Sequence, residues 1–298
     1  MNVLITGGGF LGARLALHLQ AAGHGVRVLD VAPPGPAVQR LLAASPPDWR
    51  IGDVAEWADV QQALQGCDGV VHLAALLTPA CAADPVRGLQ VNALGTLHVF
   101  EAARAAGLRH VVYASSGAVY GPHSAAQPAP STLYGTWKLA AEGIARACHQ
   151  DHGIGSVGLR PFIVYGAGRE VGGSSGPSIA CRAAVQGQAY TIPFTGRCGL
   201  VYVDDVVEAF AAALTPRRPG AHVFNLVGEE ADVEQVIAEI RRHVPGARLA
   251  AEGPPLPLAP GVLADDTAAV LGPVRHTPLA AGIAATLAAC RAEPVIDG

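Results

Sequence analysis

The sequence predicts an α/β fold with a doubly wound parallel sheet and a small C-terminal lobe that binds substrate. Short runs rich in valine, isoleucine and leucine are typical of strands buried on both faces of a parallel sheet. Alanine-rich helical patterns alternate with these runs, which implies right-handed βαβ crossovers. The predicted strands span residues 3–5, 26–29, 69–73, 111–114 and 156–159.

The first predicted strand leads directly into a Gly-x-Gly-x-x-Gly turn at residues 7–12, and a helical pattern follows it. In such a turn the first glycine permits a tight bend, the second lets the backbone approach a pyrophosphate, and the third packs the helix on the sheet. Backbone N–H groups at the helix start also face the phosphate charge. The turn therefore predicts a Rossmann-type dinucleotide site, although a glycine turn without a ligand is the alternative. The candidate cofactor contacts are Gly7, Gly9, Phe10, Leu11 and Gly12.

Asp30 ends the second predicted strand, at about the distance expected for a residue that binds the cofactor ribose. Its carboxylate can accept hydrogen bonds from ribose hydroxyls and repels a 2'-phosphate. No arginine follows immediately, so the sequence favours NAD over NADP as the cofactor. The alternative is an ordinary surface aspartate at a strand end.

Later elements follow the same alternation until about Gly168, where glycine and proline become denser. Each predicted helix ends at a glycine suited to a C-cap. We expect residues 1–167 to form mainly the dinucleotide-binding domain, and residues 168–298 mainly a small substrate-binding lobe with some segments returning to the core. The predicted helices span residues 11–22, 60–65 and 86–106.

Tyr134 and Lys138 are four residues apart, so on a helix they share one face and can act on the same substrate. A free tyrosine has a pKa of about 10 and is a poor base near neutrality. A nearby cation favours the phenolate, and we therefore expect Lys138 to lower the pKa of Tyr134. The pair predicts a general acid/base for hydride transfer.

Composition excludes several classes of protein. Half of the 298 residues are hydrophobic and 15% are charged, which argues against disorder, and the net charge of -4 gives no overall attraction to nucleic acid. The chain begins with a strand-like run rather than a basic signal-peptide start, and no apolar stretch is long enough to span a membrane, so we expect a cytoplasmic protein. The cysteines and histidines fall in no metal-ligand pattern, and we expect no metal site.

Together these motifs resemble the extended short-chain dehydrogenases/reductases, of the NAD-dependent epimerase/dehydratase family. The resemblance covers essentially the whole chain. Further matching segments are Asp53-Val54, His72-Leu73-Ala74-Ala75 and residues 91–96, 159–166 and 201–206.

The resemblance implies further site residues. Asp53 and Val54 would contact adenine, and Asn92 would bond near the cofactor. Ser116 would polarise the substrate oxygen beside Tyr134 and Lys138. The other implied cofactor contacts are Leu73, Ala74, Ala75 and Pro161, and the implied substrate contacts are Thr78, Ser116, Gly117 and Ile163.

Several of these assignments have simpler alternatives. Ser116 could satisfy a backbone group at the strand end, and Asn92 could cap a helix. The pair Asp204-Asp205 favours capping and orienting the helix that follows over chemistry. Glu142 could pair with Lys138 along the helix or face solvent.

The chain also departs from the family pattern. The glycine turn is one residue shorter than the common Gly-x-x-Gly-x-x-Gly. Ile163 stands where nucleotide-sugar epimerases carry an asparagine for the diphosphate, and their phosphate-binding arginine aligns with Cys198, with Arg197 one place away. Because these polar anchors are lost, a smaller substrate is favoured.

We therefore expect an NAD-dependent oxidoreductase that acts on a hydroxyl or carbonyl of a small sugar, sugar acid or hydroxy acid. The alternative is a nucleotide-sugar epimerase or dehydratase with tightly bound NAD, and a non-catalytic NAD-binding protein is disfavoured. The resemblance also implies a homodimer that pairs two long helices from each subunit.

Overall fold

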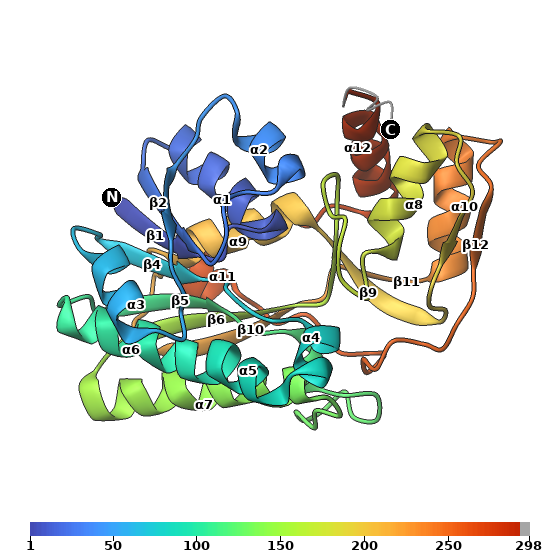
Figure 1. The fold of residues 1–298 in the computed structure, drawn as a ribbon. Coiled ribbons are helices and arrows are strands. Elements are labelled where there is room, and N and C mark those ends of the chain that lie inside the picture. Colours follow the sequence, from blue (N-terminus) through green and yellow to red (C-terminus); the bar gives the residue numbers. More distant parts are fainter. Residues whose placement is uncertain (293–298) are drawn as a thin grey trace.

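The computed structural model describes residues 1–292 and places a central parallel sheet between two layers of helices (Figure 1). Within these residues the sheet has seven strands in the order β10-β6-β5-β4-β1-β2-β3, and every neighbouring pair is parallel. The order reverses between β1 and β4, so the predicted doubly wound fold is confirmed. The strands are β1 (Asn2–Thr6), β2 (Gly25–Asp30), β3 (Asp48–Ile51), β4 (Gly69–His72), β5 (His110–Ala114), β6 (Gly155–Pro161) and β10 (Ala221–Leu226).

Alternate residues of β1 face opposite helical layers, as expected for a strand buried on both faces. Val3 and Ile5 belong to a hydrophobic cluster with α1 and α9, whereas Leu4 belongs to a second cluster with α3 and α6. None of the helices in residues 1–292 has the length and hydrophobicity needed to cross a membrane. The layers comprise α1 (Phe10–Ala21), α2 (Pro36–Leu42), α9 (Val203–Ala213) and α11 (Ala268–Leu271) on one face, and α3 (Trp57–Leu64), α6 (Gly95–Ala105) and α7 (Leu133–His152) on the other.

The predicted helix over residues 86–106 is helical but is not one α-helix. It divides into α5 (Pro85–Leu89), a π-helical segment (Gln90–Leu94) and α6, and the short α4 (Thr78–Ala83) precedes it. Single π-helical turns often mark functional sites. This one contains Asn92, whose buried amide bonds to the backbone of Leu76.

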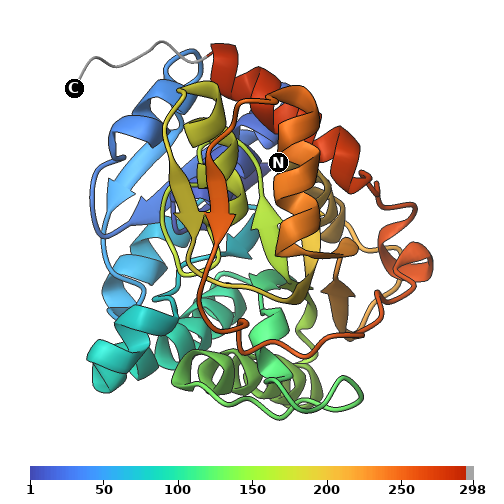
Figure 2. The same ribbon diagram turned by 90° about the vertical axis from the view of Figure 1, so that its right-hand side faces the viewer.

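Two small sheets and three helices form the lobe beyond the central sheet (Figure 2). In the described chain β9 pairs with β7 and β11, and β8 pairs with β12. Helix α12 packs against α8 and α10. The elements are β7 (Ile163–Tyr165), β8 (Tyr190–Ile192), β9 (Arg197–Tyr202), β11 (Glu229–Asp232), β12 (Leu249–Ala251), α8 (Gly176–Val185), α10 (Val233–His243) and α12 (Leu279–Ala292).

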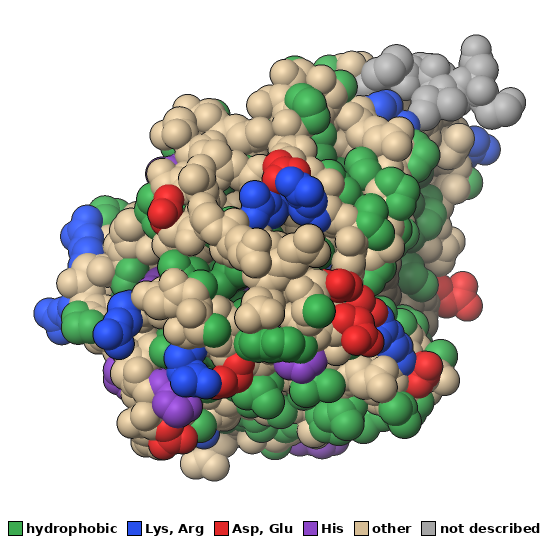
Figure 3. Space-filling view, turned by 60° about the vertical axis from the view of Figure 1, so that its left-hand side comes forward, with side chains coloured by type: hydrophobic (Ala, Val, Ile, Leu, Met, Phe, Trp, Pro, Cys, Tyr) green, Lys and Arg blue, Asp and Glu red, His purple; other side chains and the backbone are tan. Residues whose placement is uncertain are grey.

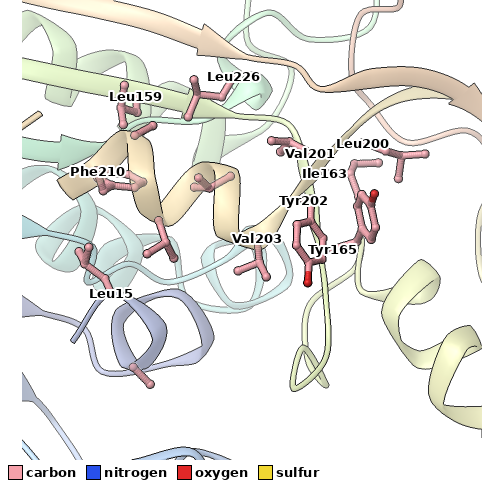
Figure 4. Close-up of a cluster of buried hydrophobic side chains, with 14 of the residues drawn as sticks. Leu15, Leu159, Ile163, Tyr165, Leu200, Val201, Tyr202, Val203, Phe210 and Leu226 are labelled. Atoms are coloured by element: carbon pink, nitrogen blue, oxygen red, sulfur yellow. The ribbon is translucent and has the colours of Figure 1, made fainter. Parts of the chain in front are cut away.

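One continuous hydrophobic cluster joins the lobe to the central sheet (Figure 4). It runs from Leu159 and Leu226 on the sheet, through Phe210 on α9, to Tyr165 on β7. Helix α12 approaches so closely that a Cβ on Gly282 would lie 1.9 Å from the Tyr165 hydroxyl oxygen. A shared core of this kind fixes the lobe over the ends of the strands. The division of the chain at residue 167 stays a prediction.

The acidic pair at the start of α9 binds other elements rather than capping its own helix. Asp205 is buried and accepts hydrogen bonds from the Thr277 backbone N–H and hydroxyl, each at 2.6 Å. Asp204 forms an ion pair with Arg14 of α1 at 3.5 Å. The expected capping role was therefore wrong, since no side chain caps α9. Both carboxylates still lie in its first turn, where negative charge is favourable.

A buried ion pair fastens α7 to β6. Arg160 donates from Nε and Nη2 to the two carboxylate oxygens of Glu142, at 2.7 and 2.6 Å. The Ser115 hydroxyl donates to the same carboxylate, and Arg160 Nη1 donates to the Tyr120 hydroxyl at 2.8 Å. The expectation that Glu142 pairs with Lys138 or faces solvent was therefore wrong. Its partner lies far along the chain, where helical spacing gives no information.

Replacement of Glu142 by glutamine should destabilise the fold strongly. The change preserves shape but leaves the Arg160 charge buried without its counterion, which costs about 3–5 kcal/mol. Urea unfolding followed by circular dichroism measures the loss. As a control, Glu101→Gln breaks the exposed pair with Arg104 on α6 and should cost less than about 1 kcal/mol. Equal losses in the two variants would contradict the role given to the buried pair.

Candidate active site

A cavity of about 620 Å³ opens where the strand order reverses, and both the central sheet and the lobe line it. Ligands of doubly wound sheets bind at this point, outside the carboxyl ends of the strands. Asn92 and Gly117 are the predicted site residues that do not line it. Those that do are Gly7, Gly9, Phe10, Leu11, Gly12, Asp30, Asp53, Val54, Leu73, Ala74, Ala75, Thr78, Ser116, Tyr134, Lys138, Pro161 and Ile163.

The shortened glycine turn retains the geometry that a dinucleotide needs. Gly7 has a φ of +84°, and a Cβ on Gly12 would lie 2.0 Å from the Gly7 carbonyl oxygen. A Cβ on Gly9 would meet nothing within 4 Å, so the backbone there is open to a ligand. Helix α1 begins directly after Gly9, and no side chain caps it. These observations fit a pyrophosphate held by the N–H groups of the α1 N-terminus.

Asp30 has a second partner that the sequence did not reveal. Its carboxylate accepts a hydrogen bond from the Gly8 backbone N–H at 2.7 Å, and it also lines the cavity. Asp30 therefore ties the end of β2 to the glycine turn. The remaining acceptor capacity of the carboxylate suits the ribose hydroxyls of NAD.

At the far end of the cavity, Asp53 is paired with Arg87 of α5, which sequence reasoning missed. Val54 is buried against Gly95, where a Cβ would lie 2.9 Å from a Val54 methyl group. The cavity wall here thus offers the apolar side chain of Val54 beside the Asp53 carboxylate, whose charge is balanced by Arg87. Such a surface fits an adenine ring.

Buried polar side chains hold the loop after β4 from behind. His72 bonds to Thr6 at 2.7 Å and to Thr96 at 3.0 Å, and burial lowers its pKa to about 3, so the imidazole stays neutral. Asn92 bonds to the Leu76 N–H at 2.8 Å and its carbonyl at 2.9 Å. Asn92 therefore neither caps a helix nor lines the cavity, and it acts by fixing the loop that carries Ala74 and Ala75.

Tyr134 and Lys138 lie on one face of α7, next to the end of β5. The helix begins after Thr132, whose hydroxyl accepts a hydrogen bond from the Gly135 N–H at 3.1 Å. Lys138 Nζ lies 5.8 Å from the centre of the Tyr134 ring and donates to the Ala114 carbonyl at 2.8 Å. The short α4 packs against the same helix.

Ser116 completes the group around the Tyr134 hydroxyl. Its side chain lines the cavity together with Tyr134, and its hydroxyl accepts a hydrogen bond from the Ala118 N–H at 3.1 Å. Ser115 is instead engaged with Glu142. Gly117 is covered by the Phe162 ring: a Cβ added to Gly117 would lie 2.8 Å from a carbon of that ring. This explains why Gly117 is absent from the cavity wall. It belongs to the short 3-10 helix η2 (Gly117–Val119).

Electrostatics at Tyr134 differ from the expectation. Burial raises the pKa of Tyr134, while the Ser116 hydrogen bond and the charge of Arg169 act to lower it. Burial also lowers the pKa of Lys138 to about 8. The cation that favours the phenolate in this structure is therefore Arg169, because the Lys138 ammonium is directed at the Ala114 carbonyl rather than the phenol oxygen.

Sequence reasoning missed Arg169 and the lobe segments that line the substrate side of the cavity. The segments are residues 172–174, in the loop before α8, and residues 256–258. The only feature of the sequence that pointed to any of these residues was an arginine within a glycine-rich stretch. Cys198, which aligns with the family's phosphate-binding arginine, and Arg197, one place away, do not line the cavity. Cys198 is buried in β9, and Arg197 pairs with Glu230 and Asp232.

Comparison with known proteins agrees with this geometry. The model of the NAD dependent epimerase/dehydratase family matches residues 3–227. A UDP-glucose 4-epimerase of Mycolicibacterium smegmatis is 34% identical over 263 residues, covering 83% of this chain and 82% of the relative. A Thermus thermophilus UDP-glucose 4-epimerase solved with NAD is 27% identical, with a TM-score of 0.78, covering 98% of this chain and 99% of that one.

A further UDP-glucose 4-epimerase structure, from Thermotoga maritima, has a TM-score of 0.85 at 23% identity and covers 97% of this chain and 98% of that one. At this identity the likeness shows the fold alone. The family match and the relatives confirm the resemblance to extended short-chain dehydrogenases/reductases and the prediction of NAD as cofactor. The chain is an NAD-dependent enzyme and belongs to the NAD-dependent epimerase/dehydratase family.

Proposed function

We propose that this enzyme oxidises a hydroxyl of a small polar molecule, or reduces the corresponding carbonyl, with Tyr134 as the general acid/base. The convergence of Tyr134, Lys138 and Ser116 in the cavity that also contains the glycine turn supports the proposal. NAD supplies the hydride acceptor when it is bound. Gly7, Gly9, Gly12 and Asp30 would hold its pyrophosphate and ribose.

In the direction of oxidation, the Tyr134 oxygen accepts the proton of the substrate hydroxyl. Ser116 orients the substrate oxygen and donates a hydrogen bond as negative charge develops on it. Lys138 would hold the cofactor ribose. Its buried ammonium lies 5.8 Å from the centre of the Tyr134 ring. In the direction of reduction, Tyr134 returns the proton.

A second candidate is a UDP-sugar epimerase, which the similarity to UDP-glucose 4-epimerases favours. Such an enzyme returns the hydride that it removes and accumulates no NADH. We rank it second because Ile163 is apolar and neither Cys198 nor Arg197 reaches the cavity. A diphosphate would therefore lack the anchors that the resemblance leads one to expect.

We also propose that the protein is a homodimer. Large hydrophobic side chains are exposed on α5, the π-helical segment, α6 and α7, and hydrophobic side chains gather on the lower part of the face in Figure 3. Contiguous exposed apolar surface is typical of an interface. The exposed residues are Val86, Leu89, Leu94, Leu97 and Leu133.

Tyr134→Phe should abolish turnover and leave NAD binding nearly unchanged, because it removes only the group that transfers the proton. General acid/base catalysis contributes about 10²–10⁴-fold, and we expect a rate loss of that order. NADH absorbance measures the rate, and calorimetric titration measures NAD affinity. Tyr190→Phe, in β8 and outside the cavity wall, is the control and should retain the wild-type rate. Retention of most activity by Tyr134→Phe would refute the catalytic assignment.

Net NADH formation should distinguish the two candidate functions. We expect stoichiometric NADH from a substrate within a panel of aldoses, uronic acids and hydroxy acids, and only weak calorimetric binding of UDP-glucose. An epimerase would instead bind the UDP-sugar at micromolar concentration and interconvert isomers without net NADH. That result would replace the first candidate by the second.

Light scattering after size-exclusion chromatography should give the mass of a dimer. Leu97→Glu places a charge in the exposed apolar surface of α6 and should shift the protein towards a monomer. Leu263→Glu changes an equally apolar and more exposed residue outside these helices, and it should leave the mass unchanged. A wild-type monomer at micromolar concentration would show that the interface is wrong.

A further inference from the structure

Arg169 is held at the cavity wall with donors to spare. It lies in the loop between β7 and α8, and its Nη1 donates to the Val164 carbonyl while its Nη2 donates to the Ser174 hydroxyl at 2.9 Å. A guanidinium carries five N–H donors in a planar fork, so these bonds position the group without using all of it. Both partners are neutral, and within residues 1–292 no carboxylate forms an ion pair with Arg169.

The other charges around the cavity already have partners. Arg87 is paired with Asp53, and the Gly8 N–H bonds to Asp30. Glu170, next to Arg169 in the chain, pairs with Arg182 of α8 instead. Arg169 is half-buried, and a cation partly removed from water without a counterion is unfavourable. An anion supplied by a ligand would compensate the charge of Arg169.

The position of Arg169 assigns that anion to the substrate rather than to the cofactor. Arg169 lines the same cavity as Tyr134, the proposed proton-transfer group, and its charge acts to lower the pKa of that tyrosine. Gly172, in the same loop, lies against Leu77, and a Cβ there would be 3.1 Å from a Leu77 methyl group. The loop thus faces residues 76–79, which include the predicted substrate contact Thr78.

We propose that Arg169 binds a carboxylate of the substrate, so that the small hydroxyl compound is a hydroxy acid or sugar acid. This inference rests on the function proposed above. A guanidinium matches the two oxygens of a carboxylate in a bidentate pair, and its single charge balances one negative charge. A diphosphate would need a further cation, and the other lining cations described are Lys138, directed at Ala114, and the paired Arg87.

The test compares acids with neutral counterparts by calorimetry at saturating NAD. The probe pairs are D-gluconate with D-glucitol, D-glucuronate with D-glucose, and UDP-glucuronate with UDP-glucose. We expect the acid of at least one pair to bind about 10- to 100-fold more tightly, the range for hydrogen bonds to charged groups. Acid preference confined to the UDP pair would place the carboxylate on a nucleotide sugar and still support the role of Arg169.

Arg169→Met should remove this acid preference and leave NAD affinity unchanged. Arg169→Lys keeps the charge but loses the bidentate fork, so it should retain only part of the preference. Arg182→Met is the matched control, because Arg182 is an ion-paired arginine of the same lobe outside the cavity wall. It should bind the acids as the wild type does.

Several outcomes would overturn the inference. These are the absence of acid preference in every pair, its survival in Arg169→Met, and a loss of NAD affinity in that variant. Equal weakening of UDP-glucose and UDP-glucuronate would assign Arg169 to the diphosphate instead. Failure of the proposed oxidation appears separately, as no NADH from any compound, while the binding preference and its loss in Arg169→Met remain measurable.

Discussion

The ion pair between Glu142 and Arg160 holds together the elements that carry the proposed catalytic side chains. It joins α7, which carries Tyr134 and Lys138, to β6, and through Ser115 it also fixes the end of β5. The pair is almost fully buried, and its polar atoms have several partners, which is the condition under which a buried charge is tolerated. Because helix and strand ends are held together here, Ser116 and Tyr134 meet at one point of the cavity.

The cavity depends equally on apolar contacts between the sheet and the lobe. The cluster from Leu159 to Tyr165 in Figure 4 is continuous, so the lobe has no separate core that would let it move freely over the sheet. This packing sets the loop of Arg169 opposite the helix of Tyr134. The resulting site has the glycine turn and Asp30 on one side and, on the side of the lobe, the Arg169 cation, which has no carboxylate partner within residues 1–292.

Residues behind the cavity wall are as important to its shape as those that line it. Asn92 fixes the Leu76 backbone from a π-helical turn, and neutral His72 bridges Thr6 and Thr96. These polar groups are buried and satisfied, so they hold a glycine- and alanine-lined surface in place. Small side chains there leave room for a flat, extended ligand.

The sequence alone determined the doubly wound fold, the use of NAD and the position of Tyr134 and Lys138 on one face of a helix, because these follow from periodicity, a glycine turn and helical spacing. Nearly all of the predicted site residues, most of them implied by the family resemblance, line one cavity. Local spacing could not find the partners of Glu142 and Asp205, which lie 18 and 72 residues away. Nor could it identify Arg169 as the cation beside Tyr134. Ion pairing, burial and the electrostatics of a cavity depend on which distant segments meet, and only the tertiary structure decides that.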